Sequence, residues 1–327
     1  MRARLFSVVL LPPLLAVYLP FCTPQVRPTQ QPWDAPLANL WSLPPNAADR
    51  DLFNGPWGAS KAPRPADVYT LVEHKHHGIN PGLTVRDATG HKWSVKQGPT
   101  DGQPSEGPIE VVLSRVLSAA GYHQPPVYFL PSFTLRDDWG THVERGGRFR
   151  LHEKSLTDIG DWSWQQNPFV GMRPYQGLLV ILAMFNSSDL KNSNNTLYEH
   201  RTGDFVERWY VVRDLGTALG ESGRLSPVRG DAAHFERYQF VLGMKNGFVL
   251  FDYHGFHQEL FRDRITPEDV GFACEMLAPL TDAQWADAFR AGGYDAATAG
   301  RFIQKVKANI ALGERIAGPD QAAGTSW

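Results

Sequence analysis

The spacing of apolar residues changes half-way along this chain, and the change limits the folds open to it. In the first half, short β-prone runs alternate with turn residues, at residues 68–72, 83–85, 93–95, 127–130 and 149–152. Residues 177–185 are instead apolar almost throughout, as in a buried helix, and Thr266 and Thr281 open segments with helix-capping signals. We therefore expect an α+β fold, with a small antiparallel sheet followed by a mainly helical part.

One helix and two hairpins are expected around these runs. Ser105 can cap the helix, Pro108 suits its first turn, and Gly121 can end it. Between these positions apolar side chains recur at helical spacing, at Ile109, Val112, Leu113, Val116 and Leu117. The hairpins are expected over residues 82–97 and 196–212, where pairs of runs flank glycine-containing turns. This order predicts a twisted sheet with a single helix packed on it.

The size and charge of the chain exclude several classes of protein. At 327 residues, with 42% hydrophobic and 20% charged residues, it can bury a sizeable core and is not a disordered chain. Its net charge is −2 and its sequence has no basic run, so no nucleic acid is expected as a partner. Its two cysteines are Cys22 and Cys274, and we expect no disulfide between them.

Residues 1–22 have the features of a signal peptide or membrane anchor. Arg2 and Arg4 form a basic start, and an apolar stretch interrupted by three prolines follows over residues 5–21. We expect an exported protein, periplasmic or extracellular. The stretch is also compatible with membrane association through the N-terminus, including at the cytoplasmic face. A buried N-terminal helix and lipidation at Cys22 are the alternatives.

The loop at residues 188–194, which follows the apolar helix, carries the most informative polar residues. Phosphoryl transfer from a nucleotide needs an acceptor hydroxyl held in line and oxygen ligands that fix Mg²⁺ on the phosphates. In the sequence Asp-Leu-Lys-Asn-Ser-Asn, Asp189 can orient the acceptor, Lys191 can neutralise charge and Asn194 can bind the metal. Asp214, at the end of the following hairpin, can complete the metal site, and Gly216 allows a sharp turn after it.

This pattern resembles protein kinases, whose catalytic loop reads Asp-Leu-Lys-x-x-Asn and whose metal motif reads Asp-Phe-Gly. Residues 189–194 match the loop, and residues 214–216 match the metal motif with Leu in place of Phe. The resemblance implies a two-lobed protein-kinase-like fold with ATP and Mg²⁺ as cofactors. It also implies Asp189 as catalytic base, Lys191 as the cation of the transition state, and Asn194 and Asp214 as magnesium ligands.

The resemblance extends upstream to a lysine and an acid. Lys96 ends a strand, as the phosphate-binding lysine of the family does, and Glu110 lies in the following helix, where the family places that lysine's partner. The resemblance therefore implies that Lys96 binds the nucleotide phosphates and that Glu110 holds the Lys96 side chain in place. Glu106 is a rival for Glu110, but it lies nearer the expected start of the helix.

Several kinase features are missing from the sequence. No Gly-x-Gly-x-x-Gly loop precedes Lys96, Ser187 and Ser188 stand where eukaryotic kinases have His-Arg, and no Ala-Pro-Glu segment follows Asp214. The atypical branch of the superfamily, bacterial or lipid-kinase-like, is similar in retaining the metal residues without these extras. The resemblance covers about residues 67–220.

These observations predict an ATP- and Mg²⁺-dependent phosphotransferase of the atypical kinase type with an alcohol group as acceptor. The acceptor, a protein or a small molecule, is not specified by the sequence. The alternative is a catalytically inactive pseudokinase that serves as an exported binding or scaffold module. The expected parts are a leader (1–22), a linker and N-terminal extension (23–66), a small lobe (67–152), a helical lobe (153–317) and a flexible tail (318–327). A hinge is expected at residues 153–155.

Overall fold

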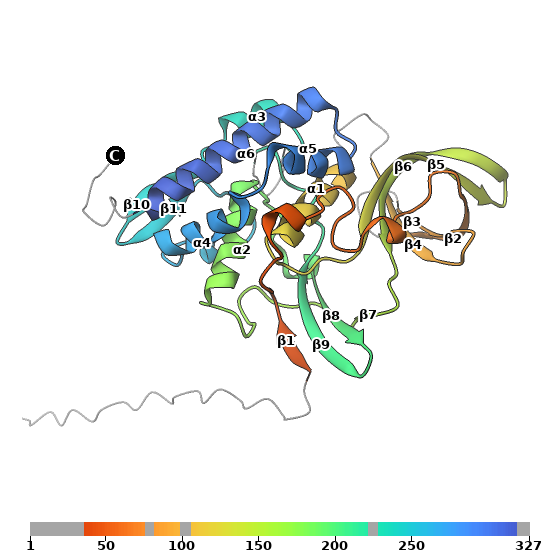
Figure 1. The fold of residues 1–327 in the computed structure, drawn as a ribbon, viewed down its shortest axis with the longest axis horizontal. Helices are drawn as coiled ribbons and strands as arrows, with labels where there is room; N and C mark the ends of the chain where they lie inside the picture. The colour runs from red at the N-terminus through yellow and green to blue at the C-terminus, as the bar shows by residue number, and fades with distance from the viewer. Residues whose placement is uncertain (1–35, 76–81, 99–105, 222–227, 319–327) are drawn as a thin grey trace, which may run out of the picture. The chain divides into compact units, whose positions relative to one another are not determined.

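The computed structural model describes residues 36–75, 82–98, 106–221 and 228–318. The expected leader at 1–22, the Ser105 cap and nearly all of the expected tail lie outside the described residues. The described residues form a mixed α+β fold, with sheets and six α-helices (Figure 1). In this part of the chain no helix combines the length and the apolar character needed to cross a membrane.

Five strands of the first half form a closed barrel. They are β2 (Val68–Lys75), β3 (Gly82–Arg86), β4 (Lys92–Gln97), β5 (Val127–Asp137) and β6 (Gly140–Leu151), in the order β2-β3-β4-β6-β5. Neighbouring strands are antiparallel except β2 and β5, whose parallel pairing closes the barrel. The sequence predicted a small antiparallel sheet, and neither its closure into a barrel nor the parallel pairing was predicted. Strand β5 runs beyond the predicted residues 127–130, and its end at Thr134 to Arg136 reaches β2.

The interior of the barrel is aromatic, and its outer face carries charge. Trp93 of β4 and Phe149 of β6 are buried inside, with ring centroids 6.0 Å apart. Because successive side chains of a strand point to opposite faces, Lys96 of β4 and Arg150 of β6 lie on the outer face. The strand pattern therefore sets cationic side chains on the side of the barrel that faces the rest of the fold.

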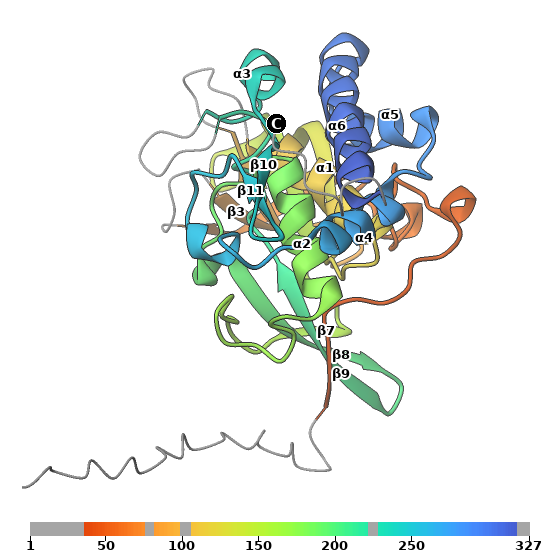
Figure 2. The same ribbon diagram turned by 90° about the vertical axis from the view of Figure 1, so that its left-hand side faces the viewer.

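Helix α1 (Glu106–Ala119) packs between the barrel and the helices. It contacts β5 and β6 on one side and α5 (Asp282–Ala291) on the other (Figures 1 and 2). Its side chains Ile109, Val112 and Val116 are fully buried, as the helical spacing predicted. A helix buried on two sides holds its acidic first turn in a fixed place relative to the barrel.

The second half is mainly helical. Besides α5 it contains α2 (Arg173–Met184), α3 (Ala232–Arg237), α4 (Pro267–Leu277) and α6 (Ala296–Ala317). Helix α6 packs against α3, α4 and α5, and α4 packs against α2 (Figure 2). The helix caps predicted at Thr266 and Thr281 are both present, and each forms a capping box, with Asp269 and Gln284 as the reciprocal residues. Short 3-10 turns lie at Ala47–Asp49, Ala59–Lys61, Asn192–Asn194 and Gln258–Leu260.

Two small sheets accompany these helices. The predicted hairpin is confirmed as β8 (Asn195–Thr202) and β9 (Phe205–Val212), which lie in the order β1-β9-β8-β7 with β1 (Leu37–Asn39) and β7 (Leu156–Asp158). A further hairpin, β10 (Val241–Lys245) and β11 (Phe248–Phe251), lies in a region predicted to be mostly helical. Its turn is Asn246-Gly247, both with positive φ, and such a dipeptide favours a hairpin over a helix.

The described part of the expected linker, residues 36–66, packs against the body of the fold. Strand β1 pairs with β9, and Leu40 and Leu52 are buried in the main hydrophobic core. The Arg50 guanidinium donates to the carbonyl of Met276 at the end of α4 (2.7 Å). This part of the chain is therefore a packed extension.

Cys274 is a buried free thiol, and burial raises its pKa to about 12.

Candidate functional site

The two kinase-like segments lie side by side, because hydrogen bonds join them at both ends. The Ser188 amide donates to the carbonyl of Thr217 (3.0 Å), and the Arg213 amide donates to the carbonyl of Asn194 (2.9 Å). These four residues flank the loop at 189–194 and the Asp-Leu-Gly segment. The structure thus brings together two of the patterns that the sequence analysis singled out.

Within the loop, the Asp189 carboxylate is held by two loop side chains. Lys191 Nζ lies 2.8 Å from Asp189 Oδ1, and Asn194 Nδ2 donates to Asp189 Oδ2 (3.0 Å) and to its backbone carbonyl (2.8 Å). The Lys191 ammonium also lies over the Phe256 ring, 4.5 Å from its centroid. Because Asn194 Nδ2 donates both of these hydrogen bonds to Asp189, the Asn194 Oδ1 atom is the one that can coordinate a cation.

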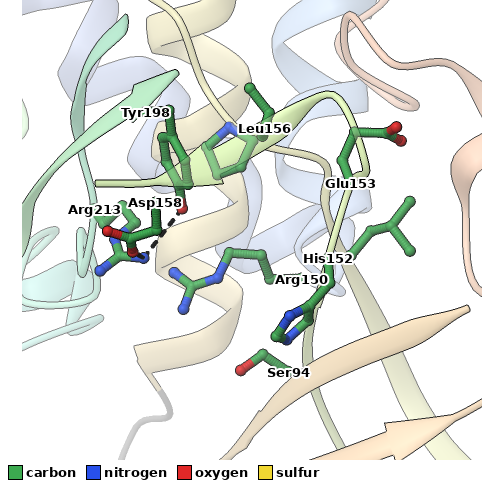
Figure 3. Close-up of a pocket in the computed structure, with 10 residues that line it drawn as sticks. Ser94, Arg150, His152, Glu153, Leu156, Asp158, Tyr198 and Arg213 are labelled. Atoms are coloured by element: carbon green, nitrogen blue, oxygen red, sulfur yellow. Dashed lines mark hydrogen bonds and ion pairs between the residues drawn. The ribbon is translucent and has the colours of Figure 1, made fainter. Parts of the chain in front are cut away.

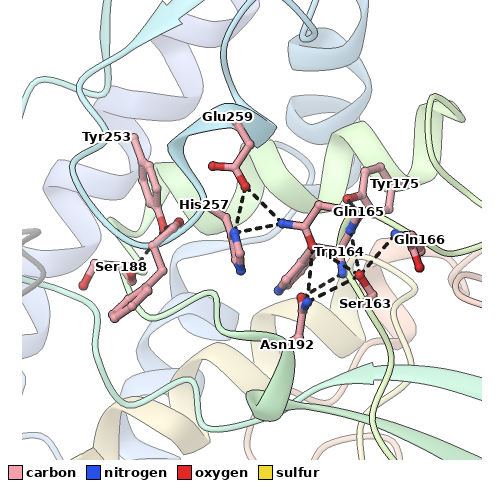
Figure 4. Close-up of polar contacts among 11 residues, drawn as sticks. Ser163, Trp164, Gln165, Gln166, Tyr175, Ser188, Asn192, Tyr253, His257 and Glu259 are labelled. Atoms are coloured by element: carbon pink, nitrogen blue, oxygen red, sulfur yellow. Dashed lines mark hydrogen bonds and ion pairs between the residues drawn. The ribbon is translucent and has the colours of Figure 1, made fainter.

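The loop is also anchored from outside (Figure 4). Asn192 Oδ1 accepts a hydrogen bond from the Trp164 amide (3.0 Å), and Asn192 Nδ2 donates to Gln165 Oε1 (3.2 Å). On the other side the Tyr253 hydroxyl donates to the carbonyl of Ser188 (3.2 Å). A loop fixed by segments on both sides can hold its polar side chains in one geometry, which positioning for chemistry requires.

Lys96 lies in a cluster of three carboxylates, one of which is Asp214. Its ammonium lies 2.6 Å from Glu106 Oε2, 3.6 Å from Asp214 Oδ1 and 3.9 Å from Glu110 Oε2. Of the two acids that the sequence offered as its partner, Glu106 is therefore the closer one. Glu110 is instead in a buried ion pair with Arg148, whose Nε lies 3.0 Å from Glu110 Oε1.

Asp214 is adapted to remain ionised. Burial by itself would raise the pKa of this carboxyl, but the charges of Lys96, Arg150, Arg148 and Arg213 hold the pKa below its ordinary value. The residue has a left-handed backbone (φ 50°), which Asp tolerates better than most residues. Its carboxylate is therefore negative at neutral pH and faces a group of cations.

Gly216 serves a different purpose from the one predicted. The sharp turn after the hairpin is made by Asp214 itself, and Gly216 has no positive φ. A Cβ on Gly216 would instead lie 2.4 Å from the Cβ of Glu106 and 2.9 Å from its carbonyl oxygen. Glycine is thus needed because the first turn of α1 lies directly against this segment.

We expect Gly216→Ala to lower the free energy of unfolding by about 1–3 kcal/mol, since the added methyl must displace the backbone at Glu106. Urea denaturation measures this loss. The matched control is Gly300→Ala in α6, where an added Cβ meets nothing within 4 Å and alanine is the better helix former. Equal, small effects of the two substitutions would contradict the close approach of α1.

A cavity of about 270 Å³ adjoins the Lys96–Asp214 cluster (Figure 3). Its lining residues come from both halves of the fold: Ser94, Pro125, Arg150, Leu151, His152, Glu153, Leu156, Asp158, Tyr198 and Arg213. Ser94 precedes Lys96 by two residues on the same face of β4, and Arg213 directly precedes Asp214. Glu153, from the expected hinge, is paired with Lys61 at 2.6 Å.

Three arginines near this cavity were not singled out by the sequence analysis. They are Arg148, Arg150 and Arg213, and Arg213 Nη1 lies 3.1 Å from the Tyr198 hydroxyl and 3.4 Å from Asp158 Oδ2. The available signal was the run Arg148-Phe149-Arg150. Its apolar centre faces the barrel interior, so the two cations must share the opposite face.

The residues present fit a magnesium ion that is held jointly by protein and substrate. Mg²⁺ is commonly bound through one or two carboxylates together with substrate phosphates and waters. In such a site Asp214 would supply one ionised carboxylate, and Asn194 would supply a side-chain oxygen from the neighbouring segment. Among the described residues no group of three or more His, Cys, Asp and Glu side chains is arranged to hold a metal by itself.

Comparison with solved structures finds a distant structural likeness. The crystal structure of a Helicobacter pylori proinflammatory kinase, CtkA, is similar to this chain with a TM-score of 0.44 at 10% sequence identity. The likeness covers 76% of this chain and 98% of that one. No protein-family model and no curated protein matches the chain. A likeness at this level carries no information about activity.

Proposed function

We propose that this protein is a magnesium- and nucleoside-triphosphate-dependent phosphotransferase of the atypical kinase type, with a two-lobed fold and an alcohol group as acceptor. The observation that carries the proposal is the approach of Lys96 to Asp214, 3.6 Å, beside a loop that holds Asp189 and Asn194. These residues come from three separate segments. Such convergence of a cation, an ionised carboxylate and amide and carboxylate oxygens suits a bound triphosphate.

In this proposal the nucleotide phosphates lie between Lys96 and the 189–194 loop. Asn194 and Asp214 would hold the magnesium ion, which supplies positive charge to the transferred group. Lys96 can bind phosphate oxygens and keep Glu106, because an ammonium has three donors. Asp189 would orient the acceptor hydroxyl, and Lys191 would neutralise charge that develops during transfer.

A thermal-shift titration of the full-length protein with magnesium and a non-hydrolysable nucleoside triphosphate tests the proposal. A ligand that binds the native state at about 100 times its Kd stabilises it by about 2.7 kcal/mol. We therefore expect the Tm to rise by about 5 °C or more. The same titration in EDTA is the control, and we expect a smaller rise there. No rise with any magnesium nucleotide would contradict the proposal.

Phosphate transfer separates the proposed enzyme from the pseudokinase alternative. An active enzyme forms a phosphorylated product, or hydrolyses the nucleotide slowly when no acceptor is added. Binding without either reaction would favour a binding or scaffold module. Because residues 1–22 have the features of a signal peptide, we also propose that the protein is exported. N-terminal sequencing of the mature chain tests whether this segment is removed.

A further inference from the structure

Arg150 lies at the wall of the cavity without a partner. Among the residues that the structure describes, its side chain makes no hydrogen bond and no ion pair, whereas Arg148 pairs with Glu110 and Arg213 bonds to Tyr198. In Figure 3 the Arg150 guanidinium points toward Asp158 and Arg213, across the space that these residues line. The cavity therefore contains a cation whose donors are unused.

The chemistry of this side chain defines what it can bind. A guanidinium has five N–H donors in a planar fork and no acceptor. Burial lowers the pKa of Arg150 to about 10, and repulsion from Arg148 and Arg213 adds to the effect, yet the group stays charged at neutral pH. A ligand that completes this site must offer two neighbouring acceptors, as a phosphate, a carboxylate or an edge of guanine does.

The position of the cavity indicates which part of a nucleotide would lie there. If the phosphates lie at Lys96 and Asp214, as proposed above, the base can extend into the adjoining space. A volume of about 270 Å³ is just below that of ordinary ligand pockets, which are roughly 300–1,000 Å³, and suits one base better than a larger group.

The two purines differ in what they present to an arginine. Guanine presents two acceptors, O6 and N7, on one edge, and arginine pairs with both at once. Adenine presents N7 and the N6 amino group on that edge, so a donor would face a donor. Guanine also carries an N2 amino group, which can donate a hydrogen bond to the Asp158 carboxylate at the cavity wall.

We propose that the cavity reads guanine and that the phosphate donor is a guanosine triphosphate, with Arg150 bonded to O6 and N7. This inference rests on the proposed function and replaces the ATP that the kinase resemblance implies. Arg150 acts here as a specificity-determining residue.

Calorimetric titration of the full-length protein with magnesium and non-hydrolysable analogues of GTP and ATP tests the inference. We expect the GTP analogue to bind about tenfold more tightly, or better. Arg150→Met should abolish this preference by weakening GTP about tenfold more than it weakens ATP. Arg150→Lys keeps the positive charge but lacks the two parallel N–H donors, so this variant should also lose most of the preference for GTP. The control is Arg136→Met, an exposed arginine of β5 outside the cavity.

A base analogue tests the same contact in the unmodified protein. The 7-deaza analogue of GTP lacks the N7 acceptor and should bind several-fold more weakly than GTP. Equal binding of the two would overturn the inference, and so would binding of ATP as tightly as GTP. Either result leaves the phosphotransferase proposal standing. Failure of both nucleotides to bind with magnesium would overturn both proposals.

Discussion

Replacing Asp214 with Asn is expected to remove magnesium-dependent nucleotide binding and phosphoryl transfer together. Asn keeps the size of the side chain and tolerates the left-handed backbone at this position, so the fold is retained. It removes the negative charge that faces Lys96 and that would hold the cation. Substitution of residues that merely support metal ligands costs about 10–100-fold. We therefore expect a loss of more than about 100-fold in magnesium-dependent affinity.

Titration of the nucleotide with and without magnesium measures this effect. The matched control is Asp204→Asn, which changes the same group in the exposed turn between β8 and β9 and should leave affinity unaltered. If Asp214→Asn binds the magnesium nucleotide as tightly as the unmodified protein, Asp214 is not a metal ligand.

Replacing Asp189 with Asn is expected to spare nucleotide binding and to lower turnover. In the proposed site Asp189 faces the acceptor hydroxyl and not the nucleotide. Removing a general base or an orienting carboxylate costs typically about 10²–10⁴-fold in rate. Lys191 would lose its ion-pair partner at 2.8 Å, which adds to the loss of geometry in the loop.

The separation of binding from turnover is the test of this role. Nucleotide affinity should stay within about twofold of the unmodified value while the rate falls, and Asp204→Asn again serves as the control. A parallel fall in affinity would identify Asp189 as part of the nucleotide site. An unchanged rate would remove it from the mechanism.

Local signals in the sequence were sufficient for many elements of the fold. The helix caps at Thr266 and Thr281 and the turn at residues 87–90 are fixed by neighbouring residues, and the structure confirms them. The Asn246-Gly247 turn was an equally local signal that the helical interpretation overrode. Closure of the barrel could not be predicted in this way, because it depends on how far β5 extends to meet a strand distant in the sequence.

The candidate site shows the same division between local and long-range information. The order of residues 189–194 is local information, so this loop could be compared with the catalytic-loop motif of kinases. The sequence analysis preferred Glu110 to Glu106, whereas Glu106 is the closer acid in the structure. Residues four apart lie on one helix face, so both can reach Lys96 and the sequence does not separate them. The close packing at Gly216 and the unpaired Arg150 depend on segments that meet only in the folded chain.

A crystal structure with magnesium and a non-hydrolysable nucleoside triphosphate tests the central claim most directly. We expect a cation about 2.1 Å from oxygens of both Asp214 and Asn194, with the phosphates within reach of Lys96. A triphosphate bound elsewhere on the molecule, or a cation that contacts neither residue, would contradict the account.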